Sequence, residues 1–161
     1  MSDIADLLER YRRGAEVVAV AATGAAGPQL DYQPGPGKWS VRQILGHLAD
    51  AELLAAARFR RVIAEENPRL LSYDQDAWAT KLNYQSRRVS EVMDLFRKLR
   101  AVNHQLLKDL PPESFSRSGT HDVEGVMTLL DLVKGYAEHT EKHAAQMQET
   151  RRLYKESRAQ A

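Results

Sequence analysis

The sequence predicts an all-α domain, a four-helix bundle that occupies residues 1–161 as a single unit. Four long segments carry apolar residues at spacings of three and four, the period of a helix that packs on one face. No segment shows the sustained alternation of apolar and polar residues that is typical of a strand. A composition of 43% hydrophobic and 28% charged residues is ordinary for a globular protein, and 161 residues are enough for one core.

The four long helices are predicted over about residues 3–22, 41–66, 89–110 and 128–155. Their limits coincide with residues that stop a helix or cap its first turn, namely Gly24, Ser40, Pro68, Pro111 and Thr128. Each helix is long enough to contribute a full apolar stripe to a shared core.

Two long connections separate the later helices. Residues 69–85 contain bulky aromatic side chains, so we expect a packed connection with one short helix near residues 74–80, and residues 113–125 form the other connection. A connection of about 20 residues can span roughly 60 Å, whereas a helix of 25 residues is only ~38 Å long. The second and third long helices can therefore run parallel, joined by a crossover.

Charge and cysteine content exclude several classes of function. The formal net charge is +1, from 23 basic and 22 acidic residues spread along the chain, so we expect no nucleic-acid partner and no membrane surface as a partner. The N-terminal segment lacks the features of a signal peptide, and we expect a cytoplasmic protein. The chain has no cysteine, which excludes disulfides and a nucleophilic thiol of its own.

A His-x-x-x-His pair in the last helix is the sharpest functional signal. His139 and His143 lie one turn apart, the spacing that lets two imidazoles reach one ion. With Leu132, Tyr136 and Gln146 they fall within an arc of roughly 80°, so both rings are expected to face the core. His47 lies at the edge of the apolar arc of the second long helix and can point to the same place. The alternative for any one of these histidines is a hydrogen-bonded core residue.

Other residues near these segments have simpler explanations. His104 stands alone on the third long helix, which favours a polar or boundary position. His121 lies in the loop before the last helix, where a turn hydrogen bond is expected, and the alternative is that it reaches the mouth of the site. Trp39 directly precedes the cap Ser40, a position typical of a hydrophobic staple.

Several blocks of sequence resemble the DinB/YfiT-like family. Residues 37–52, GKWSVRQILGHLADAE, are similar to the second-helix signature of that family. Residues 125–130, GVMTLL, followed by YAEH at 136–139 and HAAQ at 143–146, are similar to its last helix with the paired histidines. The order and separation of these blocks are more specific than the His-x-x-x-His spacing alone.

The resemblance implies an up-down-down-up four-helix bundle with a divalent metal ion, zinc or nickel, on His47, His139 and His143. It also implies a homodimer, and for some members a low-molecular-weight thiol, such as bacillithiol or mycothiol, as cosubstrate. The remaining positions on the metal would be open to water or substrate.

The first functional hypothesis is therefore a metal-dependent enzyme that transfers such a thiol to a small electrophilic substrate. The alternatives are metal-dependent hydrolysis and a non-catalytic, stress-associated protein that binds metal or ligand. Asp50 and Glu52 lie near His47 in sequence and are candidates for orienting or basic roles, although acids on a helix surface are the commoner explanation.

Overall fold

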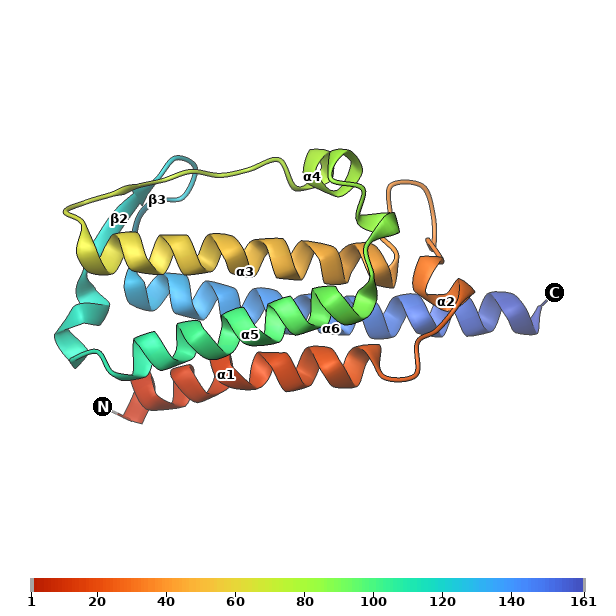
Figure 1. Ribbon diagram of the computed structural model, residues 1–161, viewed down its shortest axis with the longest axis horizontal. Helices are drawn as coiled ribbons and strands as arrows, with labels where there is room; N and C mark the ends of the chain where they lie inside the picture. Colours follow the sequence, from red (N-terminus) through yellow and green to blue (C-terminus); the bar gives the residue numbers. More distant parts are fainter. Residues whose placement is uncertain (1, 161) are drawn as a thin grey trace.

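Four long helices form the body of the computed structural model, which describes residues 2–160. They are α1 (Ser2–Ala22), α3 (Val41–Ala64), α5 (Val89–Lys108) and α6 (Leu129–Ala159). In Figure 1, α1 and α6 run in one direction and α3 and α5 in the other, so the predicted up-down-down-up order is confirmed. The last helix is longer than expected and extends past the ends of the others.

Capping explains why α3 and α6 begin where they do. Ser40 accepts a hydrogen bond from the Gln43 backbone N–H, and the Gln43 side chain accepts one from the Ser40 N–H. Thr128 and Asp131 form the same reciprocal arrangement at the start of α6. Two capping boxes therefore fix the first turns of the two helices that carry the histidines.

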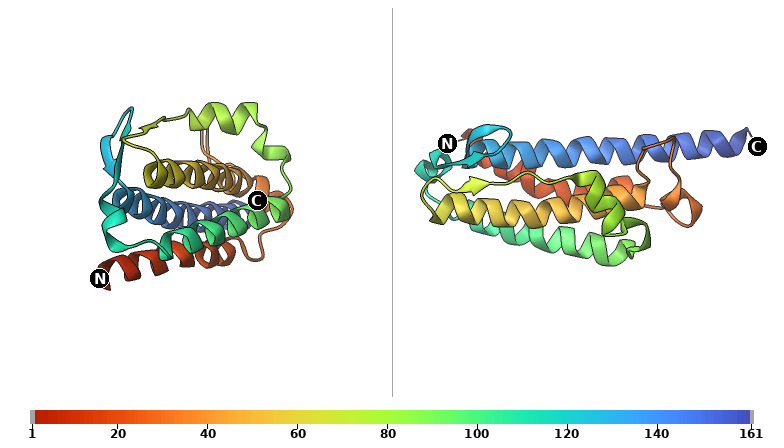
Figure 2. Two further views of the ribbon diagram at one scale, coloured as in Figure 1. Left: turned by 60° about the vertical axis from the view of Figure 1, so that its left-hand side comes forward. Right: turned by 90° about the horizontal axis from the view of Figure 1, so that it is seen from above.

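The parallel helices α3 and α5 are joined by a crossover that runs the length of the bundle. It contains β1 (Arg69–Leu70), α4 (Gln75–Lys81) and a 3₁₀ turn, Tyr84–Ser86. In the left view of Figure 2 it passes outside α3, so α3 lies between the crossover and the other long helices. The short helix expected near residues 74–80 is present as α4.

A small sheet is the feature that the all-α prediction missed. The strand β1 pairs in parallel with β2 (Ser118–His121), which pairs antiparallel with β3 (Gly125–Thr128). Strands of two and four residues are too short to show a period in the sequence. A Cβ on Gly119 would lie 2.8 Å from the Pro68 carbonyl oxygen, so only glycine allows this close pairing. The short helix α2 (Pro28–Asp31) and the 3₁₀ turn Pro112–Ser116 also escaped prediction.

The core contains a buried ion pair that contacts all four long helices. Arg100 of α5 and Glu52 of α3 are each 1% exposed, with 2.7 Å between Nη2 and Oε2. Arg100 also donates to Thr140 Oγ1 on α6 at 2.7 Å and to the Tyr11 carbonyl oxygen on α1 at 2.8 Å. The Tyr11 hydroxyl and Asn103 Nδ2 donate to Glu52. The position of each helix along the bundle is therefore set by hydrogen bonds as well as by packing.

Apolar side chains fill the bundle on both sides of this ion pair. One cluster includes Tyr11, Phe59, Leu107, Leu129 and Val133, and the other includes Ile44, Leu48, Phe96, Ala144 and Met147. No helix within residues 2–160 combines the length and the apolar character needed to cross a membrane.

Two glycines on helices provide a matched test of packing around the ion pair. A Cβ on Gly14 would lie 2.8 Å from Arg100 Nη1, whereas a Cβ on Gly135 meets nothing within 4 Å. We expect Gly14→Ala to lower the free energy of unfolding by roughly 1–3 kcal/mol, and Gly135→Ala to raise it by about 1 kcal/mol through helix propensity. Urea unfolding followed by circular dichroism measures both. A stabilising Gly14→Ala would contradict the close packing around Arg100.

Candidate metal centre

The structure brings three imidazoles from two helices to one point. His47 lies on the buried face of α3 and is 1% exposed, and His139 and His143 lie one turn apart on α6. The Nε2 atoms of His47 and His139 are 2.9 Å apart, and those of His143 and His139 are 3.1 Å apart. One nitrogen from each ring lies within 4.8 Å of the other two.

Neighbouring side chains orient two of these rings. His143 Nδ1 lies 2.8 Å from Gln146 Oε1, which can only accept a hydrogen bond, so Nδ1 carries the proton and Nε2 presents its lone pair. The Tyr73 hydroxyl on the crossover lies 3.4 Å from His47 Nδ1. This contact could not be predicted from the sequence, because it depends on the path of the crossover.

Trp39 shields the rings on another side. Its ring centroid is 4.9 Å from that of His47 and 6.3 Å from that of His143, the latter at an interplanar angle of 17°. It also packs against the apolar cluster around Ile44 and Leu48, consistent with its predicted packing role. The indole therefore belongs to the core and to the wall of the histidine cluster.

Burial keeps all three imidazoles neutral. The pKa of His47 and of His139 is lowered to about 3, mainly by desolvation and in addition by the neighbouring histidine rings. Desolvation also lowers the pKa of His143. A neutral imidazole has a free lone pair, the form that binds a metal ion.

Asp50 and Glu52 are buried rather than on the helix surface, at 5% and 1% exposure. Asp50 accepts hydrogen bonds from the Tyr84 hydroxyl at 2.7 Å and from Arg87 at 2.9 Å, so it anchors the end of the crossover. Glu52 accepts from Arg100, as described above. Within residues 2–160, neither carboxylate makes a hydrogen bond to one of the three imidazoles.

Gly46 lets the crossover come close to α3 beside His47. A Cβ on Gly46 would lie 2.9 Å from Cγ of Tyr84, whose ring packs directly on the helix. The sequence shows a glycine inside a helix, which normally weakens it. The need for glycine at this position is explained only by the packing of the crossover on α3.

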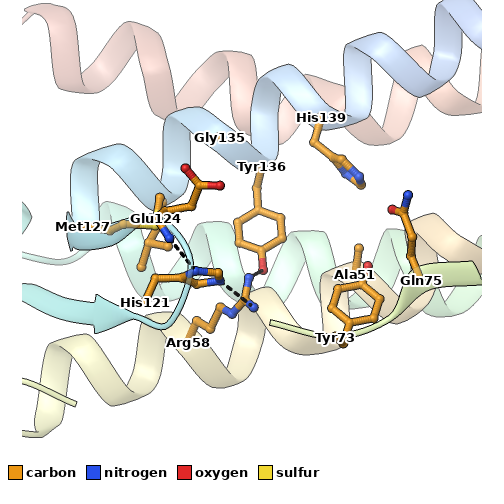
Figure 3. A pocket seen from close by; sticks show the side chains of 11 residues that line it. Ala51, Arg58, Tyr73, Gln75, His121, Glu124, Met127, Gly135, Tyr136 and His139 are labelled. Atoms are coloured by element: carbon orange, nitrogen blue, oxygen red, sulfur yellow. Dashed lines mark hydrogen bonds between the residues drawn. The ribbon is translucent and has the colours of Figure 1, made fainter. Parts of the chain in front are cut away.

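A pocket of about 370 Å³ opens beside the cluster (Figure 3). His139 and Tyr73 line one end, and His121 and Glu124 line the other, where the Arg58 guanidinium and the Tyr136 hydroxyl meet His121. Its remaining lining residues are Ala51, Gln75, Met127, Leu132 and Gly135. The volume is at the small end of the range for small-molecule sites.

The other two histidines lie outside the cluster. His121 Nδ1 accepts hydrogen bonds from the backbone N–H groups of Val123 and Glu124, both at 3.2 Å, which is the turn hydrogen bond expected from the sequence. Its ring also lines the pocket, in line with the alternative that it reaches the mouth of the site. His104 is half-buried on α5.

Comparison with known proteins points to one family. The model of the DinB superfamily matches residues 10–147. OB0782 of Oceanobacillus iheyensis is 33% identical over 117 residues, covering 73% of this chain and 67% of that protein. YfiT of Bacillus subtilis is 31% identical over 125 residues, covering 77% and 70%. Both relatives are provisionally named metal-dependent hydrolases.

Comparison with solved structures also finds four-helix bundle proteins. The structure of YfiT from Bacillus subtilis, described as an unusual four-helix bundle topology, matches with a TM-score of 0.88 and 26% identity, over 94% of this chain and 87% of that one. The four-helix bundle protein TT2238 matches with a TM-score of 0.65 at 17% identity, which shows the fold alone.

The lowered pKa values make the stability of the metal-free protein depend on pH. The folded pKa of His47 and His139 is about 3 and the ordinary value is 6.5, so between these limits the unfolded chain binds more protons. Stability is therefore lost as the pH falls below 6.5. We expect a loss on the order of 2 kcal/mol per imidazole between pH 7 and pH 5, measured by urea unfolding in a chelator.

The double variant His47→Gln, His139→Gln provides the comparison for this measurement. Its stability should change less between the two pH values than that of the original chain. An equal change in both proteins would show that these rings do not carry the pH dependence.

Proposed function

This chain belongs to the DinB superfamily, and we propose that it is a metal-dependent enzyme whose divalent ion is held by His47, His139 and His143. The convergence of the three ring nitrogens is the observation that carries the proposal. The provisional names of the relatives, all metal-dependent hydrolases, support the metal dependence.

The donor set fits such an ion. Two nitrogens bound to a tetrahedral zinc at about 2.0–2.1 Å lie roughly 3.3 Å apart, close to the 2.9 and 3.1 Å found here. His143 already presents its Nε2 lone pair, because its Nδ1 proton is held by Gln146. Imidazole suits zinc and nickel, so both ions are consistent with this set.

Three neutral ligands suit catalysis better than a closed structural site. A divalent ion held this way would supply a Lewis acid with an open position, where a bound thiol or water loses its proton readily. The chain's own residues place the reacting group and limit access of water. His139 lines the pocket and so places the reacting group at its end, while Trp39 and Tyr73 cover the rings and limit access of bulk water.

We propose further that the reaction transfers a low-molecular-weight thiol to an electrophilic carbon, so that a carbon–sulfur bond forms, the leaving group departs from that carbon and the thiol proton is released. The chain has no cysteine, so the sulfur must come from a cosubstrate. The two buried acids near His47 are engaged elsewhere, so neither of them contacts the rings to act as a general base. A thiol depends less than water on a general base for deprotonation, because the ordinary pKa of a thiol is near 8.5.

Hydrolysis is the second candidate, favoured by the names of the relatives. It would use the same histidines and the same pocket, with water in place of the thiol. The two reactions therefore differ in the nucleophile and not in the residues that hold the ion.

Metal titration tests the site itself. We expect one zinc ion per chain, with His143→Gln weakening the affinity by more than about 100-fold because a direct ligand is lost. His104→Gln removes a histidine outside the cluster and should bind zinc like the original chain. Competition with a chromogenic chelator gives the affinities. Equal zinc affinity in the two variants would rule out this assignment.

A thiol-consumption assay separates the candidate reactions. With zinc- or nickel-loaded protein, bacillithiol, mycothiol, glutathione and coenzyme A are each offered with a panel of electrophiles. Thiol transfer is expected to give saturable thiol loss that His143→Gln abolishes. Saturable ester or amide cleavage without thiol loss would favour hydrolysis, and inactivity in both assays would favour a binding protein.

The homodimer implied by the resemblance stays a prediction. Sedimentation velocity of the purified protein measures the mass of the particle directly.

A further inference from the structure

The pocket beside the histidines has a polar end where two side chains with N–H groups meet. His121 and Arg58 meet there, with 3.3 Å between His121 Nε2 and Arg58 Nη2. Figure 3 shows both side chains and the Tyr136 hydroxyl between the helices α3 and α6.

The protonation of His121 follows from its other nitrogen. Nδ1 accepts two backbone N–H groups, from Val123 and Glu124, so in the neutral ring the proton lies on Nε2. Asp122 Oδ1 also lies 3.4 Å from Nδ1, but this carboxylate already accepts hydrogen bonds from the N–H and the hydroxyl of Ser72. In a doubly protonated ring Nε2 is again a donor. Two N–H donors, on His121 and on Arg58, therefore face each other.

Arg58 brings a positive charge to this end of the pocket. Among residues 2–160, no carboxylate oxygen forms an ion pair with its guanidinium. Its acceptors are neutral, namely the Tyr136 hydroxyl oxygen at 2.9 Å and the Leu71 carbonyl oxygen at 2.5 Å. These two bonds hold the guanidinium in place and leave its charge free to attract an anion.

Tyr136 supplies a third donor at this end of the pocket. Its oxygen accepts from Arg58, so its own hydrogen is free to point elsewhere. Tyr136 lines the pocket and lies three residues before His139 on α6, which places the two side chains on the same face of the helix. The polar end and the histidine cluster thus belong to one cavity.

We propose that this end of the pocket binds a carboxylate, through Arg58, the His121 Nε2–H and the Tyr136 hydroxyl. The ligand is then a small carboxylic acid whose other end reaches His139. Its identification as the substrate rests on the proposed metal-dependent function, whereas the carboxylate site itself does not. Two of the residues that line the pocket, Ala51 and Gly135, are small and leave room for the body of the ligand.

A carboxylate fits this end better than a phosphate does. One guanidinium supplies one full charge, and Glu124 lies at the rim of the same pocket, where it repels a dianion more strongly than a monoanion. A guanidinium and a second N–H donor side by side match the two oxygens of a carboxylate.

Binding of three probes to the metal-free protein tests the site. Butyrate, its uncharged analogue butyramide and propylphosphonate are compared by ligand-observed NMR titration. We expect butyrate to bind at least about 10-fold more tightly than butyramide. Tighter binding of propylphosphonate than of butyrate would assign the site to phosphate instead. Equal affinity for butyrate and butyramide would overturn the proposal.

Variants show whether Arg58 is responsible. Arg58→Gln should weaken butyrate binding by at least about 10-fold and leave the affinity for butyramide unchanged. Arg58→Lys keeps the charge and should weaken butyrate binding by less. Arg97→Gln, which removes an exposed arginine paired with Asp94, is the control for charge and should bind butyrate normally. Glu124→Gln should strengthen butyrate binding. Full butyrate affinity in folded Arg58→Gln would refute the role of this residue.

Zinc affinity is measured on the same proteins. Zinc binding without butyrate binding would refute the carboxylate site alone. Butyrate binding without zinc binding would leave the carboxylate site standing and remove the metal-dependent function.

Discussion

The buried ion pair between Glu52 and Arg100 is the interaction on which the rest of the structure depends. Burying two charges costs roughly several kcal/mol for each ion. This cost is offset only where the two charges are well aligned and further hydrogen bonds satisfy their remaining donors and acceptors. Here the partners come from all four long helices, so a shift of any helix would break a hydrogen bond to one of the two buried charges. Glu52 follows His47 on α3, and Thr140 follows His139 on α6. The ion pair thereby fixes the two histidine-bearing helices relative to each other.

The long helices could be predicted because helical period, caps and breakers are local properties of the sequence, whereas their up-down-down-up order was an expectation from the family resemblance. The inward direction of His139 and His143 followed from the same period. The partners of Asp50 and Glu52 could not be predicted, because Arg87 and Arg100 lie 37 and 48 residues further along the chain. A carboxylate on a helix looks like a surface residue until the helix that carries its arginine is placed.

The small sheet escaped prediction for a related reason. Its strands are too short for a pattern, and β1 pairs with β2 across a separation of about fifty residues in the sequence. Yet this pairing has consequences for the pocket. It sets the crossover beside β2, which brings the Leu71 carbonyl and His121 together around the Arg58 side chain. The polar end of the pocket therefore depends on how distant segments of the chain pair, whereas the histidine end could be predicted from the helical period.

The two ends of the pocket consequently depend on different parts of the fold. The imidazoles are fixed by the helices and their buried charges, where most substitutions would disturb the whole bundle. The opposite end is built where the crossover and the β2–β3 hairpin meet an arginine of α3, and such connections tolerate change more readily than a core does. The same histidine geometry can then serve ligands that differ at their far ends. Specificity in this fold is expected to lie in the crossover and the hairpin, while the chemistry lies in the bundle.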